Sequence, residues 1–258
     1  MKKAMNAYPK ELVKVICEAY PDYWPLTREQ ICYFLFRKVE AGRSAPTSFQ
    51  EAMDRRFPYD TYLRKFLDRN LDGPPFLEEI LKSDCLSESD RTNESHLELW
   101  VDDAALTEFL CFHTRKFTGI PVYDAGRFQN VFAAREVKDR FARLRKTTGR
   151  LPVVLFLADL DAAGHQRYEA LADLYGDYAH FDRVGINVKH ASGLFSKPRV
   201  LCDDRELTED GFFARELSLP GCYSLSAIEP PALVEMVCHA VNLHRMWAFH
   251  RGFHAELK

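Results

Sequence analysis

A chain of 258 residues, 47% of them hydrophobic and 28% charged, is large and apolar enough for one large globular domain or two smaller ones. Its net charge of −3 gives no overall sign of a nucleic-acid-binding protein, and seven cysteines without a C-x-x-C pair argue against a disulfide framework or a zinc site. No apolar run reaches the length that crosses a bilayer, and the amphipathic N-terminus has no signal-peptide core, so we expect a cytoplasmic protein without a membrane segment.

The first part of the chain, residues 1–94, is predicted to form a helical domain. Its apolar residues recur at helical spacing in three segments, and no clear stretch shows the alternation of a half-buried strand. In LTREQICYFLFRK, Thr27 can cap a helix, with Gln30 in the reciprocal position of a capping box. The polar stretch LKSDCLSESDRTNESH has no periodicity and is predicted to be a linker, so we place the domain boundary between residues 94 and 95.

The second part, residues 95–258, alternates strand-like with helix-like segments. One helical segment, RFQNVFAAREVKDRFARLRKTTGR, holds much of the chain's positive charge, and PPALVEMVCHAVNLHRMWAFHRGF forms a final amphipathic helix. This alternation predicts an α/β fold in which a four-stranded parallel sheet is flanked by helices. The predicted strands are HLELWV, GIPVYDAG, LPVVLFLA and FDRVGINV.

Three aspartates follow strands of the predicted sheet. Asp102 comes after the first strand, and Asp159 and Asp161 come directly after LPVVLFLA. Ligands of an open parallel sheet bind beyond the carboxyl ends of the strands. If the first and third strands are neighbours, the carboxylates meet there, and oxygen donors without His or Cys suit Mg²⁺, or Mn²⁺ in its place. The simpler interpretation is that Asp159 and Asp161 only cap the next helix.

The same acids also fit a phosphoacceptor receiver domain. In that interpretation Asp102, Asp103 and Asp159 surround the phosphorylation site, and Lys189 is its lysine. The separation between Asp103 and Asp159 is long for two strands with a helix each, and a helical domain would have to precede the receiver. It is therefore the weaker alternative.

Four motifs, in the expected order, resemble the topoisomerase VI A-subunit group, which includes the meiotic break-forming transesterase. LELWVDDAAL resembles the first motif of the group's Toprim domain, and FLADLDAAG resembles its D-x-D-x-x-G motif. KPRVLCDDREL and YSLSAIEPPALVEMV are similar to the segments that follow Toprim in small bacterial and phage members. Upstream, PLTREQICY is similar to the P-L-T-x-R-x-I-x-Y string of the group's winged-helix domain.

This resemblance implies both an architecture and an activity. The architecture is a winged-helix-like DNA-binding domain over residues 1–94, followed by a Toprim domain with a C-terminal helical extension over residues 95–258. The activity is magnesium-dependent DNA cleavage, in DNA processing or in plasmid or phage defence, as in the nuclease subunit of Wadjet-like systems. The resemblance also implies a homodimer and an SMC-type or other ATPase partner, since this chain has no G-x-x-x-x-G-K-[ST] loop.

The chain departs from the family pattern at several positions. The Toprim glutamate is Asp102 here, the lysine after it is Asp103, and the arginine of the winged-helix string is displaced, leaving Glu29. The family's acid near the end of Toprim is replaced by Ser224 or Ser226. Because these changes bear on turnover more than on metal binding, a non-catalytic DNA-binding protein with a degenerate Toprim domain is the second hypothesis.

The resemblance assigns roles to four candidate catalytic residues. Asp159 and Asp161 would hold the metal, and Asp102 would be a further ligand or would transfer a proton to the leaving oxygen. The nucleophile is either an activated water or Tyr33, which matches the family's DNA-attacking tyrosine and would form a 5′-phosphotyrosyl link. Tyr33 also fits simple packing on an apolar helix.

Basic residues from three regions are candidate DNA contacts. His165, next to the acidic motif, fits either a phosphate contact or an ion pair with a nearby acid. Phosphate contacts position a protein on DNA, but ordinary solvated surface charge explains the same residues. The candidates are Arg28, Arg135, Lys138, Arg143, Lys146, Lys197 and Arg205.

Overall fold

The computed structural model describes residues 18–23, 26–27, 29–31, 33–34, 96–186 and 223–255, with no side-chain description for residues 115, 116 and 247–255. Most of the predicted winged-helix-like domain therefore lies outside the described residues, and the boundary at residue 94 stays a prediction. Four of the predicted functional residues lie outside them as well: Arg28, Lys189, Lys197 and Arg205.

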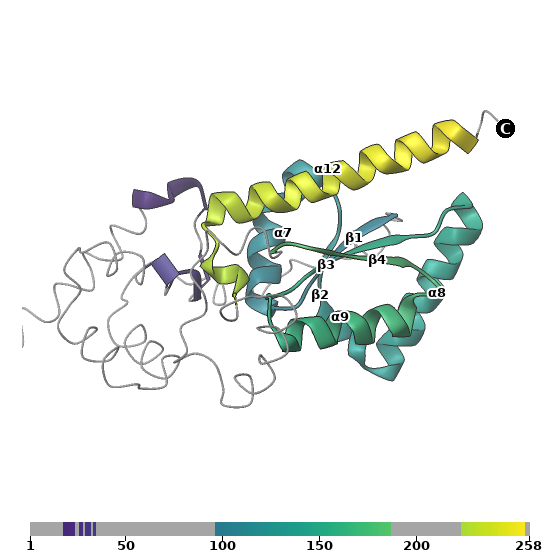
Figure 1. Ribbon diagram of the computed structural model, residues 1–258, viewed down its shortest axis with the longest axis horizontal. Coiled ribbons are helices and arrows are strands. Elements are labelled where there is room, and N and C mark those ends of the chain that lie inside the picture. The colour runs from purple at the N-terminus through teal and green to yellow at the C-terminus, as the bar shows by residue number, and fades with distance from the viewer. Residues whose placement is uncertain are drawn as a thin grey trace, which may run out of the picture.

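Four parallel strands form the sheet at the centre of residues 96–186, which confirms the predicted strands and their direction. They are β1 (Leu97–Val101), β2 (Val122–Asp124), β3 (Val153–Leu157) and β4 (His180–Val184). Their order is β2-β1-β3-β4, so β1 and β3 are the central pair (Figure 1). The two run in register from Leu97 beside Val153 to Val101 beside Leu157.

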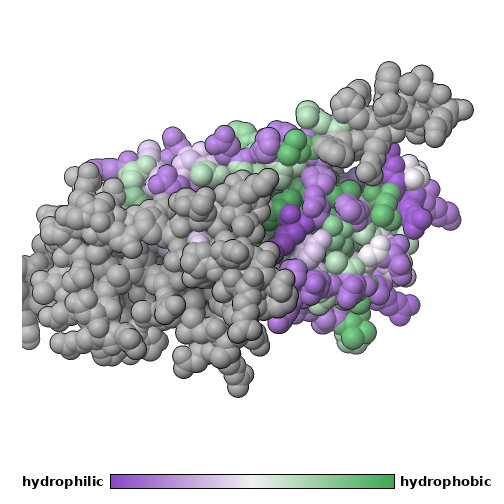
Figure 2. All heavy atoms as spheres, in the orientation of Figure 1, coloured by the Kyte–Doolittle hydropathy of each residue, from purple (hydrophilic) through white to green (hydrophobic). Residues whose placement is uncertain are grey.

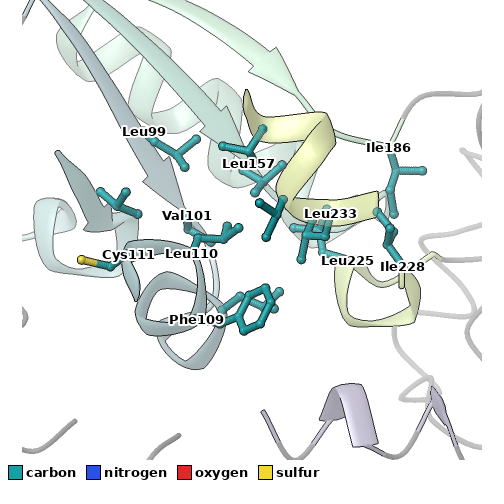
Figure 3. Close-up of a cluster of buried hydrophobic side chains, with 14 of the residues drawn as sticks. Leu99, Val101, Phe109, Leu110, Cys111, Leu157, Ile186, Leu225, Ile228 and Leu233 are labelled. Atoms are coloured by element: carbon teal, nitrogen blue, oxygen red, sulfur yellow. The ribbon is translucent and has the colours of Figure 1, made fainter. Parts of the chain in front are cut away.

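Helices cover both faces of this sheet. Side chains of α7 (Ala104–Thr118) and α12 (Pro230–Ala255) pack on one face, and those of α8 (Val131–Thr148) and α9 (Ala162–Tyr175) pack on the other (Figure 1). Successive residues of a strand point to opposite faces, so Leu99 and Val101 join the first cluster while Trp100 joins the second. Figure 3 shows how leucine and valine side chains from β1, β3, α7 and the residues around the start of α12 meet in the first cluster.

Trp100 is the centre of the second cluster. It is fully buried, and its ring centroid lies 4.2 Å from that of Phe128 and 5.4 Å from those of Tyr175 and Phe181. The indole Nε1 donates a 2.9 Å hydrogen bond to a carboxylate oxygen of Glu98 on the same strand. A buried indole N–H needs such an acceptor, because leaving it unpaired costs the desolvation free energy of the donor.

Glu98 is a buried carboxyl group that pairs with Arg140. Its carboxylate accepts a 2.8 Å hydrogen bond from Nη2 of Arg140 on α8, whose Nη1 donates to the hydroxyl of Tyr123 at 3.2 Å. Burial raises the pKa of Glu98, and the Arg140 charge and the hydrogen bond from Trp100 counteract that rise. This network joins β1, β2 and α8 across the second face of the sheet.

The basic helix begins later than the sequence pattern predicts. Residues Ala125–Gln129 form a short 3-10 helix, η2, and the chain then breaks at Asn130, whose side chain accepts a 2.8 Å hydrogen bond from the Ala133 N–H. An asparagine cap of this kind fixes the start of a helix, and periodicity alone does not reveal it. Gly149 ends α8 with φ +70°, a left-handed conformation that favours glycine.

The described part of the N-terminal segment packs on the second part of the chain. The Thr27 N–H donates to the Gln30 side chain at 3.0 Å and the Gln30 N–H donates to Thr27 Oγ1 at 3.1 Å, which confirms the predicted capping box. Leu26 and Phe34 belong to the hydrophobic cluster that also contains Leu225. The two predicted domains thus share a core over the described residues.

Hydrophilic and hydrophobic residues lie side by side on the described part of the face that Figure 2 shows. Val131 and Phe132, at the start of α8, are among the most exposed large apolar residues that the structure describes, with 83% and 87% of their surface exposed. None of the helices in the described ranges combines the length and the apolar character needed to span a bilayer.

Candidate functional site

The three predicted aspartates lie at the carboxyl ends of the two central strands. Because Val101 and Leu157 are register partners, Asp102 leaves β1 at the same level at which the chain leaves β3. The Asp102 N–H donates to the Leu157 carbonyl at 2.9 Å, which extends the pairing by one bond. The first and third strands are therefore neighbours, which is the condition that the predicted acidic site requires.

Asp159 is held by two segments that are far from it in sequence. Its Oδ1 accepts a 2.8 Å hydrogen bond from the Leu225 N–H, and its main-chain carbonyl accepts a 2.7 Å hydrogen bond from Nη2 of Arg183 on β4. Leu160, the next residue, forms an antiparallel bridge with Tyr223 through two hydrogen bonds of 2.9 and 3.1 Å. The turn Asp159–Asp161, called the acidic turn below, is thus held in place by Arg183 of β4 and by residues 223–225.

Asp161 is the N-cap of α9, as the simpler interpretation predicts, whereas Asp159 does not cap this helix. Its Oδ1 accepts a 2.7 Å hydrogen bond from the Gly164 N–H, and the residue is only 7% exposed. A capping carboxylate also gains from the positive end of the helix dipole. Capping occupies Oδ1 and does not by itself prevent the other oxygen from binding a cation.

Gly164 is the glycine of the D-x-D-x-x-G motif, and it packs directly against Asp159 and Asp161. It lies inside the first turn of α9, and a Cβ atom placed there would lie 2.5 Å from the main-chain oxygen of Asp159 and 3.1 Å from Oδ1 of Asp161. Any side chain would push the helix away from the acidic turn. The glycine of the D-x-D-x-x-G motif is therefore required by the close packing of α9 against the Asp159–Asp161 turn.

Asp102 pairs with an arginine of α9. Nη1 of Arg167 forms an ion pair with its carboxylate and also lies 3.4 Å from its carbonyl oxygen. Burial raises the pKa of Asp102, the Arg167 hydrogen bond and charge lower it, and the charges of Asp161 and Asp103 raise it again. Asp102 and Asp161 are thus close enough for their charges to interact.

Asp103 caps α7. Its Oδ1 accepts a 2.7 Å hydrogen bond from the Leu106 N–H, and its carbonyl accepts the N–H of Thr107 at 2.8 Å. Where the family pattern has a lysine, this chain has a residue that starts a helix. The Asp103 side chain thus serves as the hydrogen-bond acceptor at the start of α7.

The sequence does not indicate that Arg167 and Arg183 lie at this site. Both lie in segments whose secondary structure was predicted, but nothing local to HFDRV or to AAGHQRYEALADLY indicates which way a long side chain points. The one available signal was a charged residue, Arg183, inside a strand of a largely buried parallel sheet.

The donor set fits a hard divalent cation in its chemistry. Asp102, Asp159 and Asp161 offer only carboxylate oxygens, the ligands that Mg²⁺ and Mn²⁺ prefer. Each of the three has one oxygen engaged with Arg167, Leu225 or Gly164. Across the residues that the structure describes, no three His, Cys, Asp or Glu side chains are grouped as metal ligands.

A further carboxylate reaches the region from the N-terminal segment. Ser224 Oγ lies 3.2 Å from Oε1 of Glu29 and donates to it, and the Leu225 N–H, one residue on, holds Asp159. Ser224 Oγ also accepts the Ser226 N–H at 3.2 Å. Ser224 and Ser226 are the two residues that the sequence resemblance offers in place of an acid, and Glu29 brings a carboxylate to Ser224 from the N-terminal segment.

Tyr33 lies in the hydrophobic interior. It is 3% exposed and belongs to the cluster that contains Leu26, Phe34 and Leu225. A DNA-attacking tyrosine has to reach a phosphate, so this burial favours the packing interpretation. His165 lies 3.1 Å from the Glu169 carboxylate, as expected for a pairing partner one helical turn away.

The basic helix does not lie beside the aspartates. The ammonium of Lys138 lies 5.9 Å from the ring centroid of Tyr175 and 5.5 Å from that of Tyr178, at the C-terminal end of α9 (Figure 1). Asp161 caps the other end of this 14-residue helix, which is about 20 Å long at 1.5 Å per residue. Arg135, Arg143 and Lys146 are exposed on α8, and Lys146 in its last turn also suits the negative end of the helix dipole.

No family model, curated protein or solved structure matches this chain. The function has to be inferred from the site itself: three aspartates at the carboxyl edge of a parallel sheet, with two arginines against them. The resemblance to Toprim sequences stays a prediction.

Proposed function

We propose that this protein is a magnesium-dependent DNA-cleaving protein with a Toprim-like site formed by Asp102, Asp159 and Asp161. The observation that carries the proposal is the pairing of β1 with β3, which brings the acid after the first strand beside the acidic turn after the third. A homodimer and an SMC-type or other ATPase partner belong to the same proposal, because the sequence resemblance implies them.

Each aspartate has a role in this proposal. Asp159 and Asp161 would hold Mg²⁺ through their carboxylate oxygens, and Mg²⁺ would neutralise charge on the scissile phosphate and help to activate the attacking water. Burial raises the pKa of Asp102. A carboxyl that keeps its proton to higher pH is better suited to deliver that proton to the leaving oxygen. Water is the proposed nucleophile because Tyr33 is buried.

Cleavage of supercoiled plasmid tests the proposal. Asp159→Asn and Asp161→Asn are the informative variants, because asparagine can still accept the hydrogen bonds from Leu225 and Gly164 and is also a good helix cap. We expect Mg²⁺- or Mn²⁺-dependent nicking that falls by on the order of 10²-fold or more in each variant. Asp139→Asn, on the exposed face of α8, is the matched control and should cleave like the wild type. Cleavage that survives EDTA or both variants would contradict the proposal.

A non-catalytic DNA-binding protein is the second candidate. Two contacts favour it: the ion pair between Asp102 and Arg167, and the capping of α9 by Asp161. Both use carboxylate oxygens that an enzyme would use to bind a metal. Gel-shift assays separate the two candidates. A binding module should retain DNA with the same affinity in EDTA and should show no cleavage with either metal.

The receiver interpretation is compatible with the strand order, because flavodoxin-like folds, including receivers, begin with the order 2-1-3-4. Against it, Asp103 is used to cap α7 and Oδ1 of Asp159 is bound to the Leu225 N–H. Treatment with acetyl phosphate followed by intact-mass measurement decides the matter. A gain of one phosphoryl group that Asp159→Asn abolishes would favour the receiver.

A further inference from the structure

Arg183 reaches the acidic turn from β4. The residue lies beside Phe156 of β3 in the parallel register, and its Nη2 donates a 2.7 Å hydrogen bond to the main-chain carbonyl of Asp159. Its Nε–H is buried and has no hydrogen-bond acceptor among the described residues. A buried guanidinium also loses its hydration, and negative charge close to it offsets that cost.

The aspartates around Arg183 favour its charge. Burial lowers the pKa of Arg183, and the negative charges of Asp161, Asp159 and Asp102 counteract this by stabilising the guanidinium. The three aspartates would otherwise repel one another, as the effect of Asp161 on the Asp102 carboxyl indicates. Arg167 forms an ion pair with Asp102, whereas the guanidinium of Arg183 lies at the Asp159–Asp161 turn, 2.7 Å from the Asp159 main-chain carbonyl oxygen.

We propose that Arg183 is the permanent counter-ion of the three-aspartate cluster: it holds the acidic turn together without a metal, and a divalent cation binds against its charge. This inference rests on the proposed metal site and adds to it the residue that sets the affinity for the metal. An arginine does not lose its proton in proteins, so its charge cannot be removed by pH.

The consequence is an affinity that is lower than that of three uncompensated carboxylates. A fixed positive charge several ångströms from a divalent cation costs enough in a partly solvated site to change the affinity by about tenfold. The same charge stabilises the folded protein when no metal is bound. Removing it should therefore tighten metal binding and weaken the metal-free fold together.

Two variants of the full-length chain separate charge from hydrogen bonding. Arg183→Gln keeps a donor for the Asp159 carbonyl but removes the charge, while Arg183→Lys keeps the charge. Arg150→Gln, at an exposed position after α8, is the matched control. The measurements are Mn²⁺ affinity by calorimetry and the midpoint of thermal unfolding in EDTA and in excess Mn²⁺.

We expect Arg183→Gln to bind Mn²⁺ about tenfold more tightly than the wild type, since one positive charge has gone from the site. We expect it to unfold at a lower temperature in EDTA and to recover most of that loss in excess Mn²⁺. Arg183→Lys and Arg150→Gln should bind Mn²⁺ with wild-type affinity. A variant that is unfolded in EDTA but folds on addition of Mn²⁺ also supports the proposal.

Equal or weaker Mn²⁺ binding by Arg183→Gln would overturn the proposal, as would an unfolded variant that Mn²⁺ does not rescue, or the absence of Mn²⁺ binding by every protein tested. These outcomes do not depend on DNA cleavage. A wild-type protein that binds Mn²⁺ but leaves plasmid intact would refute the proposed function and leave the role of Arg183 to be decided by the affinities.

Discussion

Arg167 on α9 forms an ion pair with Asp102 at the end of β1. Because α9 begins at the residue after Asp161, this pair ties the acid of the first strand to the helix that the acid of the third strand caps. Asp102 and Asp161 are thus fixed relative to one another by one helix, through its second turn and through its N-cap.

Loss of this ion pair should be measurable but small. Arg167 is 38% exposed, so solvent screens much of the interaction, and we expect Arg167→Met to lower the free energy of unfolding by about 1 kcal/mol. Urea unfolding of the wild type, Arg167→Met, Asp102→Asn and the double variant gives the coupling energy. Additive effects of the two single changes would mean that the pair contributes nothing to stability.

The buried carboxyl of Glu98 predicts how stability depends on pH. Burial raises its pKa above the ordinary value of 4.5, so the folded protein binds this proton more tightly than the unfolded chain does. The resulting stabilisation is complete below pH 4.5 and is lost as the pH rises through the folded pKa. We expect the stability of Glu98→Gln, relative to the wild type, to increase with pH over this interval.

Unfolding in urea at a series of pH values from 4 to 8 checks the Glu98 prediction. Glu98→Gln removes the ion pair with Arg140, which shifts the whole stability curve of the variant. The slope of the difference with pH, and not its absolute value, therefore carries the information. Parallel curves for the two proteins would show that Glu98 has the same pKa in both states.

Gly164→Ala should disturb the packing of α9 against the Asp159–Asp161 turn. A methyl group 2.5 Å from the Asp159 carbonyl oxygen forces the backbone to move, and we expect a loss of about 2–3 kcal/mol in the free energy of unfolding. Gly126→Ala is the control, because its Cβ would meet only the Asp124 side chain, at 3.1 and 3.9 Å. A Gly164→Ala protein as stable as this control would show that this position has room for a side chain.

Tyr33→Phe distinguishes packing from covalent catalysis. If Tyr33 only packs, the variant should cleave plasmid within about twofold of the wild-type rate and remain close to it in stability, because the ring is retained. Denaturing gels of cleavage reactions test directly for a protein–DNA adduct. An adduct that forms in the wild type and disappears in Tyr33→Phe would make the tyrosine the nucleophile despite its burial.

Much of the fold could be predicted because its signals are local. LPVVLFLA becomes β3 because a strand covered by helices on both faces needs apolar residues at every position. Thr27 and Gln30 satisfy each other over three residues, so their capping box is visible in the sequence. The predicted start of the basic helix was wrong. Asn130 caps α8 at a later position, and the hydrophobic periodicity of the sequence does not reveal that cap.

The candidate site could be predicted only in part. The alternation of strands and helices indicates a parallel sheet with Asp102, Asp159 and Asp161 at strand ends. It does not specify that the first and third strands are neighbours, which is what brings Asp102 near the other two. The contacts of Arg183, Arg167 and Glu29 depend on side chains that cross between elements far apart in sequence. No local pattern specifies such contacts, because they follow from how the helices and strands pack in three dimensions.

The hydrogen bonds around Ser224 and Leu225 have a consequence for how the protein is made. Asp159 receives the Leu225 N–H from 66 residues further along the chain, and Ser224 meets Glu29 across 195 residues. A ribosome therefore releases the sheet and all three aspartates well before it releases the segment that holds Asp159. A nascent chain halted before residue 223 should carry the three aspartates without the hydrogen bond from Leu225. The site therefore reaches its final form late in synthesis, when residues 223–225 pack against Asp159 and Glu29.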